Sequence, residues 1–193
     1  MATERQAVKR LPRAQRREQL LDAATRAFAR AGYAATGLDE VAAEAGVTHV
    51  ILYRHFASKA ELYRAVLDRA CERLSRDVGP STGDYDDNAI PALLRAAAAD
   101  PDGFRLLFRH AAREPEFRDV VDKIRSASTD IAHRHLGEAI PPGPWQDWAA
   151  HLIPTLTLEA AIAWLDAGQP DDPARAAVRI SQAIQGVVQA ATG

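Results

Sequence analysis

The chain has 193 residues, of which 47% are apolar and 26% are charged, and its formal net charge is −2. This composition is ordinary for a globular protein of one or two domains and too polar for a membrane protein, because no run of about 18 apolar residues occurs. The N-terminus lacks the apolar segment of a signal peptide, and a single cysteine excludes an internal disulfide or a cysteine-based zinc site. We therefore expect a cytoplasmic protein with no membrane partner.

The first 17 residues form a basic arm. They contain only one acidic residue, Glu4, and six basic residues: Arg5, Lys9, Arg10, Arg13, Arg16 and Arg17. A basic segment in front of a more acidic remainder indicates that the front of the chain meets a polyanion such as nucleic acid. The alternative is a solvated tail without a partner.

Two helices are expected after the arm. Pro12 suits the first turn of a helix, and apolar residues then recur at spacings of three and four until Gly32 ends the pattern. Thr36 stands three residues before Asp39, a cap-like pairing that predicts the start of a second, shorter helix. Gly46 is expected to close it.

A third and a fourth helix follow closely. Thr48 can cap a helix that runs to about Phe56, and Ser58 with Glu61 forms an S-x-x-E capping box that opens a longer helix. Residues 36–56 therefore predict a helix-turn-helix with a supporting helix on either side.

Two domains are expected. The segment GPSTGDYDDN at 79–88 is rich in turn formers and predicts a linker, although the helix from Lys59 leads directly towards it. We place a basic arm and helix-turn-helix domain at residues 1–58 and a second helical domain at 59–193. The fold class is therefore all-α.

The second domain should contain five further helices. Proline marks most of their starts, and Pro154 inside an apolar run should kink one of them. The expected ranges are 88–100, 101–113, 115–137, 144–168 and 172–191.

The last two helices carry more apolar surface than one small bundle needs. A two-fold homodimer in which they form a four-helix bundle with their partners would bury it, while the alternative is that both face their own core. The candidate interface residues are Leu156, Ala160, Ala163, Trp164, Ile184 and Val188.

Residues that carry chemistry are sparse. His133 and His135 are two positions apart on a helix and therefore point to different sides, and no H-x-x-x-H set occurs. Phosphate-binding glycine loops and nucleophile motifs are absent as well. We expect no catalytic site, no metal site and no cofactor.

Three consecutive stretches form a distinctive combination: FARAGYAATGLDEVAAEAGV, THVILYRHF and ASKAELYRAV. Through them, roughly residues 14–65 resemble the tetracycline-repressor (TetR) family of bacterial transcription regulators. It implies an N-terminal three-helix DNA-binding domain and a C-terminal ligand-binding and dimerisation domain. The implied function is a non-enzymatic regulator, most simply a repressor released from a palindromic operator by a small molecule.

The resemblance assigns DNA contacts to the helix-turn-helix. Phosphates would be contacted by Thr36, Tyr53, His55 and Lys59. Bases would be read by, or lie next to, Thr48, His49, Val50, Ile51 and Arg54. Arg54 could meet either a guanine or a phosphate.

Three positions depart from the family pattern. Val50 and Ile51 stand where small or hydroxyl-bearing residues are common, so that a thymine methyl is their natural partner in the major groove. Gly37 follows Thr36 where a second hydroxyl is common, so its backbone N–H could make that contact instead. The operator sequence therefore stays open.

The family plan also implies a cavity for an apolar or amphipathic effector in the second domain. The candidate lining residues are Phe104, Leu107, Phe108, Ile124, Trp145 and Trp148. Two alternatives to a repressor stay open: an activator or corepressor-dependent regulator of the same fold, and a helical enzyme or interaction module whose helix-turn-helix is purely structural.

Overall fold

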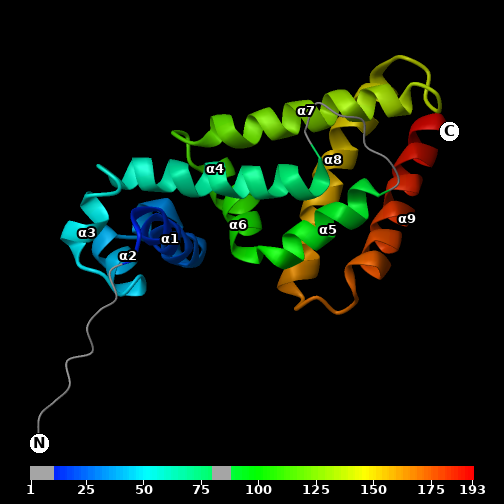
Figure 1. Cartoon of the computed structure of the whole chain (residues 1–193). Coiled ribbons are helices and arrows are strands. Elements are labelled where there is room, and N and C mark those ends of the chain that lie inside the picture. The colour runs from blue at the N-terminus through cyan, green and yellow to red at the C-terminus, as the bar shows by residue number, and fades with distance from the viewer. Residues whose placement is uncertain (1–10, 80–87) are drawn as a thin grey trace, which may run out of the picture. The chain divides into compact units, whose positions relative to one another are not determined.

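The computed structural model describes residues 11–79 and 88–193, and every regular element in these ranges is a helix (Figure 1). The chain divides into two compact units, Met1–Tyr63 and Arg64–Gly193, a few residues later than the expected boundary. Most of the predicted basic arm, residues 1–10, and most of the predicted linker, residues 80–87, lie outside the described residues.

The first unit is built from α1 (Arg13–Ala35), α2 (Leu38–Glu44), α3 (His49–Tyr53) and the beginning of α4 (Lys59–Val78). All four contribute apolar side chains to one core. Its largest fully buried members are Leu20, Phe28, Leu52, Phe56, Leu62 and Tyr63. The expected helix-turn-helix is therefore present, with α1 packed against α2 and α2 against α3.

Glycines set the breaks between these helices. Gly32 has a φ of 77° and interrupts the last turns of α1, and Gly46 has a φ of 63° in the turn that joins α2 to α3. Both values lie in the left-handed region that a residue with a Cβ rarely adopts. Both breaks match the sequence prediction.

Of the three expected helix caps, Ser58 with Glu61 is right and Thr36 is wrong, while Thr48 is the N-cap residue of α3 but makes no capping hydrogen bond through its side chain. The Ser58 hydroxyl accepts the Glu61 backbone N–H at 3.1 Å, and the Glu61 carboxylate accepts the N–H of Ala57 at 2.7 Å. In contrast, the N-cap residue of α2 is Gly37, and no side chain caps that helix. Thr36 does not cap α2 because its hydroxyl points back into α1.

The second unit contains the rest of α4 and the elements α5 to α9. Proline occupies the first position of α6, α8 and α9, as expected, while α8 continues through Pro154. The elements are α5 (Ala89–Ala99), α6 (Pro101–Arg105), a π-helical turn η1 (Leu106–His110), a 3₁₀ turn η2 (Ala111–Arg113), α7 (Arg118–Leu136), α8 (Pro144–Asp166) and α9 (Pro173–Thr192).

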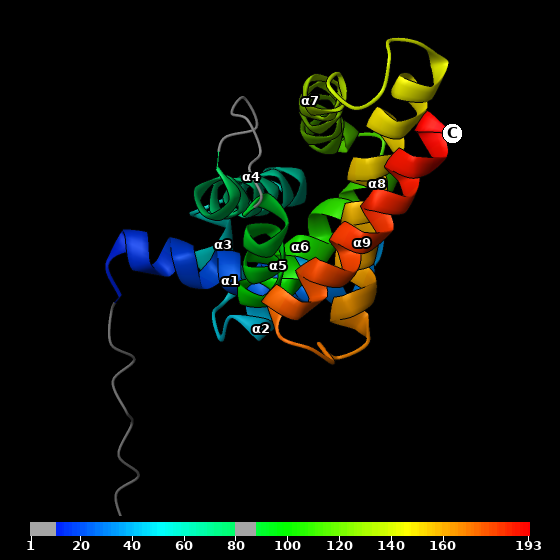
Figure 2. The same ribbon diagram turned by 90° about the vertical axis from the view of Figure 1, so that its right-hand side faces the viewer.

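Helix α8 is the centre of the second unit, since it packs against α5, α7 and α9 (Figure 2). By length and composition alone α8 is apolar enough to cross a membrane, and 44% of its most apolar stretch is buried. Packing against α5, α7 and α9 accounts for the buried part of that stretch. Asp166 at its end accepts hydrogen bonds from Arg105 and Arg109 at 3.0 and 2.7 Å, which ties α8 to α6 and η1.

Candidate nucleic-acid interface and ligand cavity

The outward face of α3 combines apolar and polar side chains. Leu52 is fully buried and holds the helix to the core, while the side chains of Val50 and Tyr53 are 61% and 49% exposed. Thr48 and Arg54 are exposed on either side of them. This short helix therefore presents side chains of limited reach, as a helix that enters a DNA groove must.

His49 is fixed in place by its neighbours. Its Nδ1 lies 2.8 Å from Oδ1 of Asp39 on α2, and its ring contacts the ring of Tyr53 with centroids 4.6 Å apart. Its Nε2 is buried and makes no hydrogen bond within the described part of the chain. Because the Asp39 carboxylate accepts the Nδ1 proton, Nε2 is the ring nitrogen left for another partner.

A positive cluster lies at the end of α3. Burial lowers the pKa of His55, and the charges of Arg13, Arg17 and Arg16 on the first turns of α1 lower it further. Arg13 and Arg17 are exposed, and the Arg17 guanidinium lies 4.6 Å from the centre of the Phe56 ring. These arginines thus belong to the same surface as α3, whereas the sequence analysis had counted them only as part of a basic arm. Their spacing of three and four residues could have indicated a common helix face.

Lys59 is held at the start of α4. Its Nζ donates a hydrogen bond to the Ala34 carbonyl at 3.2 Å and lies 4.6 Å from the centre of the Tyr33 ring. The ammonium is thus positioned next to the first turn of α4, whose N–H groups and dipole favour an anion.

The side chain of Thr36, expected to contact a phosphate, is buried in the structure. Its side chain is 1% exposed, and its hydroxyl donates to the Gly32 carbonyl at 2.8 Å, with the Ala27 carbonyl at 3.3 Å. A hydroxyl buried in this way cannot reach a phosphate. Thr36 therefore stabilises the interrupted end of α1, and the expected phosphate contact from its side chain does not fit this structure.

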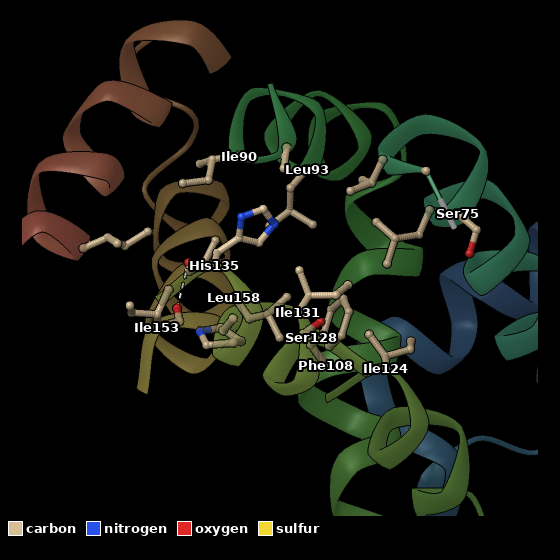
Figure 3. Close-up of a pocket in the computed structure, with 18 of the residues that line it drawn as sticks. Ser75, Ile90, Leu93, Phe108, Ile124, Ser128, Ile131, His135, Ile153 and Leu158 are labelled. Carbon is tan, nitrogen blue, oxygen red and sulfur yellow. Dashed lines mark hydrogen bonds between the residues drawn. The ribbon is translucent and has the colours of Figure 1, made fainter. Parts of the chain in front are cut away.

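The second unit encloses an apolar cavity of about 320 Å³ between α4, α5, α7, α8 and α9 (Figure 3). Phe108 and Ile124, two of the expected lining residues, form part of its wall. The sequence analysis missed the rest of this face of α7, on which Ser128, Ile131 and His135 follow Ile124 at helical spacing.

The other four expected lining residues lie elsewhere. Phe104 and Leu107 are buried and line a second, smaller hollow next to α4 and α5. Trp145 and Trp148 are exposed at the start of α8, where their rings meet edge to face with centroids 5.8 Å apart. They were wrong as cavity residues because the buried side of this turn is formed by its alanines, Ala149 and Ala150.

Three of the six expected interface residues face their own subunit. Trp164 is buried, and its Nε1 donates to the Asp171 carbonyl at 3.1 Å, while Ile184 and Val188 line the cavity. The apolar face of α9 is therefore largely occupied within the subunit. Of the six, only Trp164 is buried; Ile184 and Val188 are half-buried, and Leu156, Ala160 and Ala163 are at least partly accessible and do not line the cavity.

In the described part of the chain, ionisable side chains do not cluster into a metal site. No set of three or more His, Cys, Asp or Glu side chains suited to a metal ion occurs within residues 11–79 and 88–193. Burial, followed by the charges of Asp68 and Glu72, raises the pKa of the Cys71 thiol to about 11. That thiol is therefore neutral and a poor nucleophile near pH 7.

Similarity to known proteins extends over nearly the whole chain. A sequence model of the bacterial regulatory proteins of the tetR family matches residues 20–66. The HTH-type transcriptional activator FasR of Mycolicibacterium smegmatis is 33% identical over 201 aligned residues, which cover 95% of this chain and 84% of that protein. The chain belongs to the TetR family.

Other TetR-family proteins agree with this placement. The HTH-type transcriptional repressor SCO4008 of Streptomyces coelicolor is 36% identical over 47% of this chain and 46% of its own length. A crystal structure of a TetR-like transcriptional regulator from Rhodococcus sp. RHA1 superposes with a TM-score of 0.77 at 22% identity, over 93% of this chain and 97% of that one, and so shares the fold. The protein is thus an all-α, DNA-binding transcriptional regulator, which is a non-enzymatic class.

Proposed function

We propose that the protein is a homodimeric, cytoplasmic regulator whose two α3 helices read a palindromic operator and whose DNA affinity is set by a small apolar or amphipathic effector. The observation that carries this proposal is the surface of the first unit. An exposed helix face around Val50 and Tyr53 lies next to a positive cluster around His55. Short side chains suit base edges, and positive charge suits the flanking phosphates.

The proposed base-reading residues are those on the open side of α3: Thr48, His49, Val50, Ile51 and Arg54. Val50 projects methyl groups outward, which favours contact with a thymine methyl in the major groove. His49 would use Nε2, since Asp39 holds Nδ1. The Tyr53 ring would have to shift with it, because the two rings are in contact.

The proposed phosphate contacts are Tyr53, His55 and Lys59, joined by Arg13 and Arg17 from α1. Arg17 is supported on the Phe56 ring, and Lys59 on the Tyr33 ring, so both cations are held in place before DNA arrives. In a two-fold dimer the two recognition helices should lie about 34–36 Å apart, one turn of B-DNA.

The dimer is proposed to form through α8 and α9. Support comes from the side of α8 that bears Leu156, Ala160 and Ala163, which its own subunit leaves partly accessible, and from Val178 on α9, which is 58% exposed. Small side chains allow close approach of helices from two subunits. Trp164, Ile184 and Val188 are left out of this interface because they are occupied within the subunit.

The effector is proposed to occupy the cavity of about 320 Å³ in the second unit. Cys71, Leu74 and Ser75 of α4 contribute to its wall, and α4 begins in the DNA-binding unit. An effector that favours one position of α4 would change operator affinity by a coupling on the order of 1–3 kcal/mol.

Repression by occupying the operator is the first candidate for the direction of regulation. Activation is a second candidate, supported by one observation: the relative that is similar along 95% of the chain is named an activator. A reporter fused to the regulated promoter, in a strain with and without the protein, distinguishes the two. Expression that rises on deletion supports repression, and expression that falls supports activation.

The DNA-contact assignment is tested by binding of the protein to its own upstream region. Tyr53→Phe, which removes only the hydroxyl, and Lys59→Ala should each weaken binding about tenfold, as expected for a lost charge-assisted contact of 1.4 kcal/mol. Lys123→Ala removes an exposed lysine from the second unit and serves as the control. Unchanged affinity in both α3–α4 variants would overturn the assignment.

A further inference from the structure

One imidazole stands in a mostly apolar wall that contains no other side chain able to carry a positive charge among the described residues. Ile124, Ser128, Ile131 and His135 lie on the same face of α7 and line the cavity (Figure 3). At 1.5 Å of rise per residue, this face extends roughly 16 Å along the helix. The cavity is therefore elongated, with His135 towards one end of the α7 face and Ile124 at the other.

The rest of the wall offers almost no charge. No Asp, Glu, Lys or Arg is among the described residues that line the cavity. The Thr157 hydroxyl already donates to the Ile153 carbonyl at 2.8 Å, and the Cys71 thiol stays protonated near pH 7. The wall also contains the hydroxyls of Ser75 and Ser128, which can donate a hydrogen bond but carry no charge. His135 is thus the one side chain in the described wall that can carry a positive charge.

The position of His135 suits a polar head group. Its side chain is exposed to solvent, yet it also faces the cavity among Ile90 and Leu93 (Figure 3). Within the described part of the chain, its ring nitrogens make no hydrogen bond or ion pair. A ligand can therefore keep its polar end hydrated beside this ring while its apolar part leaves water, which avoids the cost of burying a charge.

We propose that the cavity binds an amphiphilic monocarboxylate, with its carboxylate paired to His135 and its apolar tail lying along α7 towards Ile124 and Phe108. A neutral imidazole can donate one N–H to this carboxylate, and a protonated one adds charge attraction. A cationic amphiphile finds no carboxylate in the described wall to pair with. The proposal rests on the proposed function, in which this cavity holds the effector, and names the chemical class of that effector.

The test compares three probes with the same tail on the full-length protein: dodecanoate, its methyl ester and dodecylamine, each below its critical micelle concentration. Isothermal titration calorimetry gives the dissociation constants for the wild type, His135→Ala and His133→Ala. His133 is two positions away on α7, does not line the cavity and serves as the matched control.

The wild type and His133→Ala should bind dodecanoate about tenfold more tightly than the ester, and dodecylamine most weakly. His135→Ala should bind the ester as before and lose the preference for the acid. Equal affinities for acid and ester in the wild type, tightest binding of the amine, an unchanged preference in His135→Ala, or no binding of any probe would each overturn the proposal.

Operator binding is measured in parallel, so that the two proposals can fail separately. If dodecanoate binds through His135 but leaves operator affinity unchanged, the carboxylate site stands and the effector role of the cavity fails. If the protein does not bind its operator even without probe, the proposed DNA contacts fail, whatever the calorimetry shows.

Discussion

His49 and Asp39 join the two helices of the helix-turn-helix through a single contact, the 2.8 Å approach of Nδ1 to Oδ1. Asp39 lies in the first turn of α2 and His49 in the first turn of α3. The pair leaves only Nε2 of His49 for another partner. If His49 reads a base as proposed, the specificity of α3 depends on a residue of the preceding helix.

Replacing Asp39 by alanine should affect specificity more than stability. The pair is exposed on its carboxylate side, so the free energy of unfolding should change by less than about 1 kcal/mol. Freed from Asp39, the His49 ring can rotate or change tautomer, and the ratio of operator to random-DNA affinity should fall severalfold. Chemical denaturation and competition binding measure the two effects; an unchanged affinity ratio would show that His49 does not read a base.

Removing the guanidinium of Arg17 should weaken DNA binding and its salt dependence together. Each lost phosphate contact should lower the slope of log affinity against log salt by about 1. Arg17→Ala also loses the contact with the Phe56 ring, which is worth about 0.5–1 kcal/mol of stability. Fluorescence anisotropy at four salt concentrations gives the slope, with Lys123→Ala as the control, and a slope equal to the wild type would exclude Arg17 from the interface.

The position of His55 predicts a pH dependence of stability. Because burial and the α1 arginines lower its pKa in the folded protein, the unfolded chain binds more protons once the pH falls below the ordinary value of 6.5. The free energy of unfolding should therefore decrease as the pH falls from 6.5 through the lowered pKa of His55. Urea denaturation of the wild type and of His55→Gln between pH 5 and 7.5 measures this, and the variant should lose less stability than the wild type. Parallel curves would contradict the prediction.

Substitutions of Thr36 can distinguish a structural role of its hydroxyl from a role in DNA contact. Thr36→Val keeps the shape but leaves the buried Gly32 carbonyl without its hydroxyl donor, so it should cost about 1–3 kcal/mol of unfolding free energy. Thr36→Ser retains the donor and should be less destabilised. Operator affinity of the folded Thr36→Val protein should equal that of the wild type, whereas a tenfold loss would restore the phosphate contact expected from sequence.

Local signals in the sequence predicted the elements well. Pro101, Pro144 and Pro173 each occupy the first position of a helix, and Gly32 and Gly46 end helices where expected. These signals depend on the conformation of a few adjacent residues, so they survive in any tertiary context. They account for most of the agreement in helix boundaries.

Predictions about which way individual side chains point were less accurate. Trp145 and Trp148 are aromatic side chains of the kind that line cavities, but they lie on the exposed side of α8. His135 was considered for a metal site, rejected, and not expected in the cavity wall, which it lines. Helical spacing indicates which residues share a face, but not which neighbouring helix that face meets. The contact expected of Thr36 does not fit for a related reason, since its hydroxyl meets two backbone acceptors earlier in the chain, the carbonyls of Gly32 and Ala27.

The contacts of Lys59 have a consequence for the timing of DNA recognition. A free lysine side chain samples many rotamers and loses up to about 2 kcal/mol of entropy when it is fixed. In this protein the Ala34 carbonyl and the Tyr33 ring already restrict the rotamers of Lys59 in the absence of DNA. The ammonium has three donors, and one is engaged by Ala34, so two remain for another partner. If Lys59 contacts a DNA phosphate as proposed, this contact would form without a slow rearrangement of its side chain.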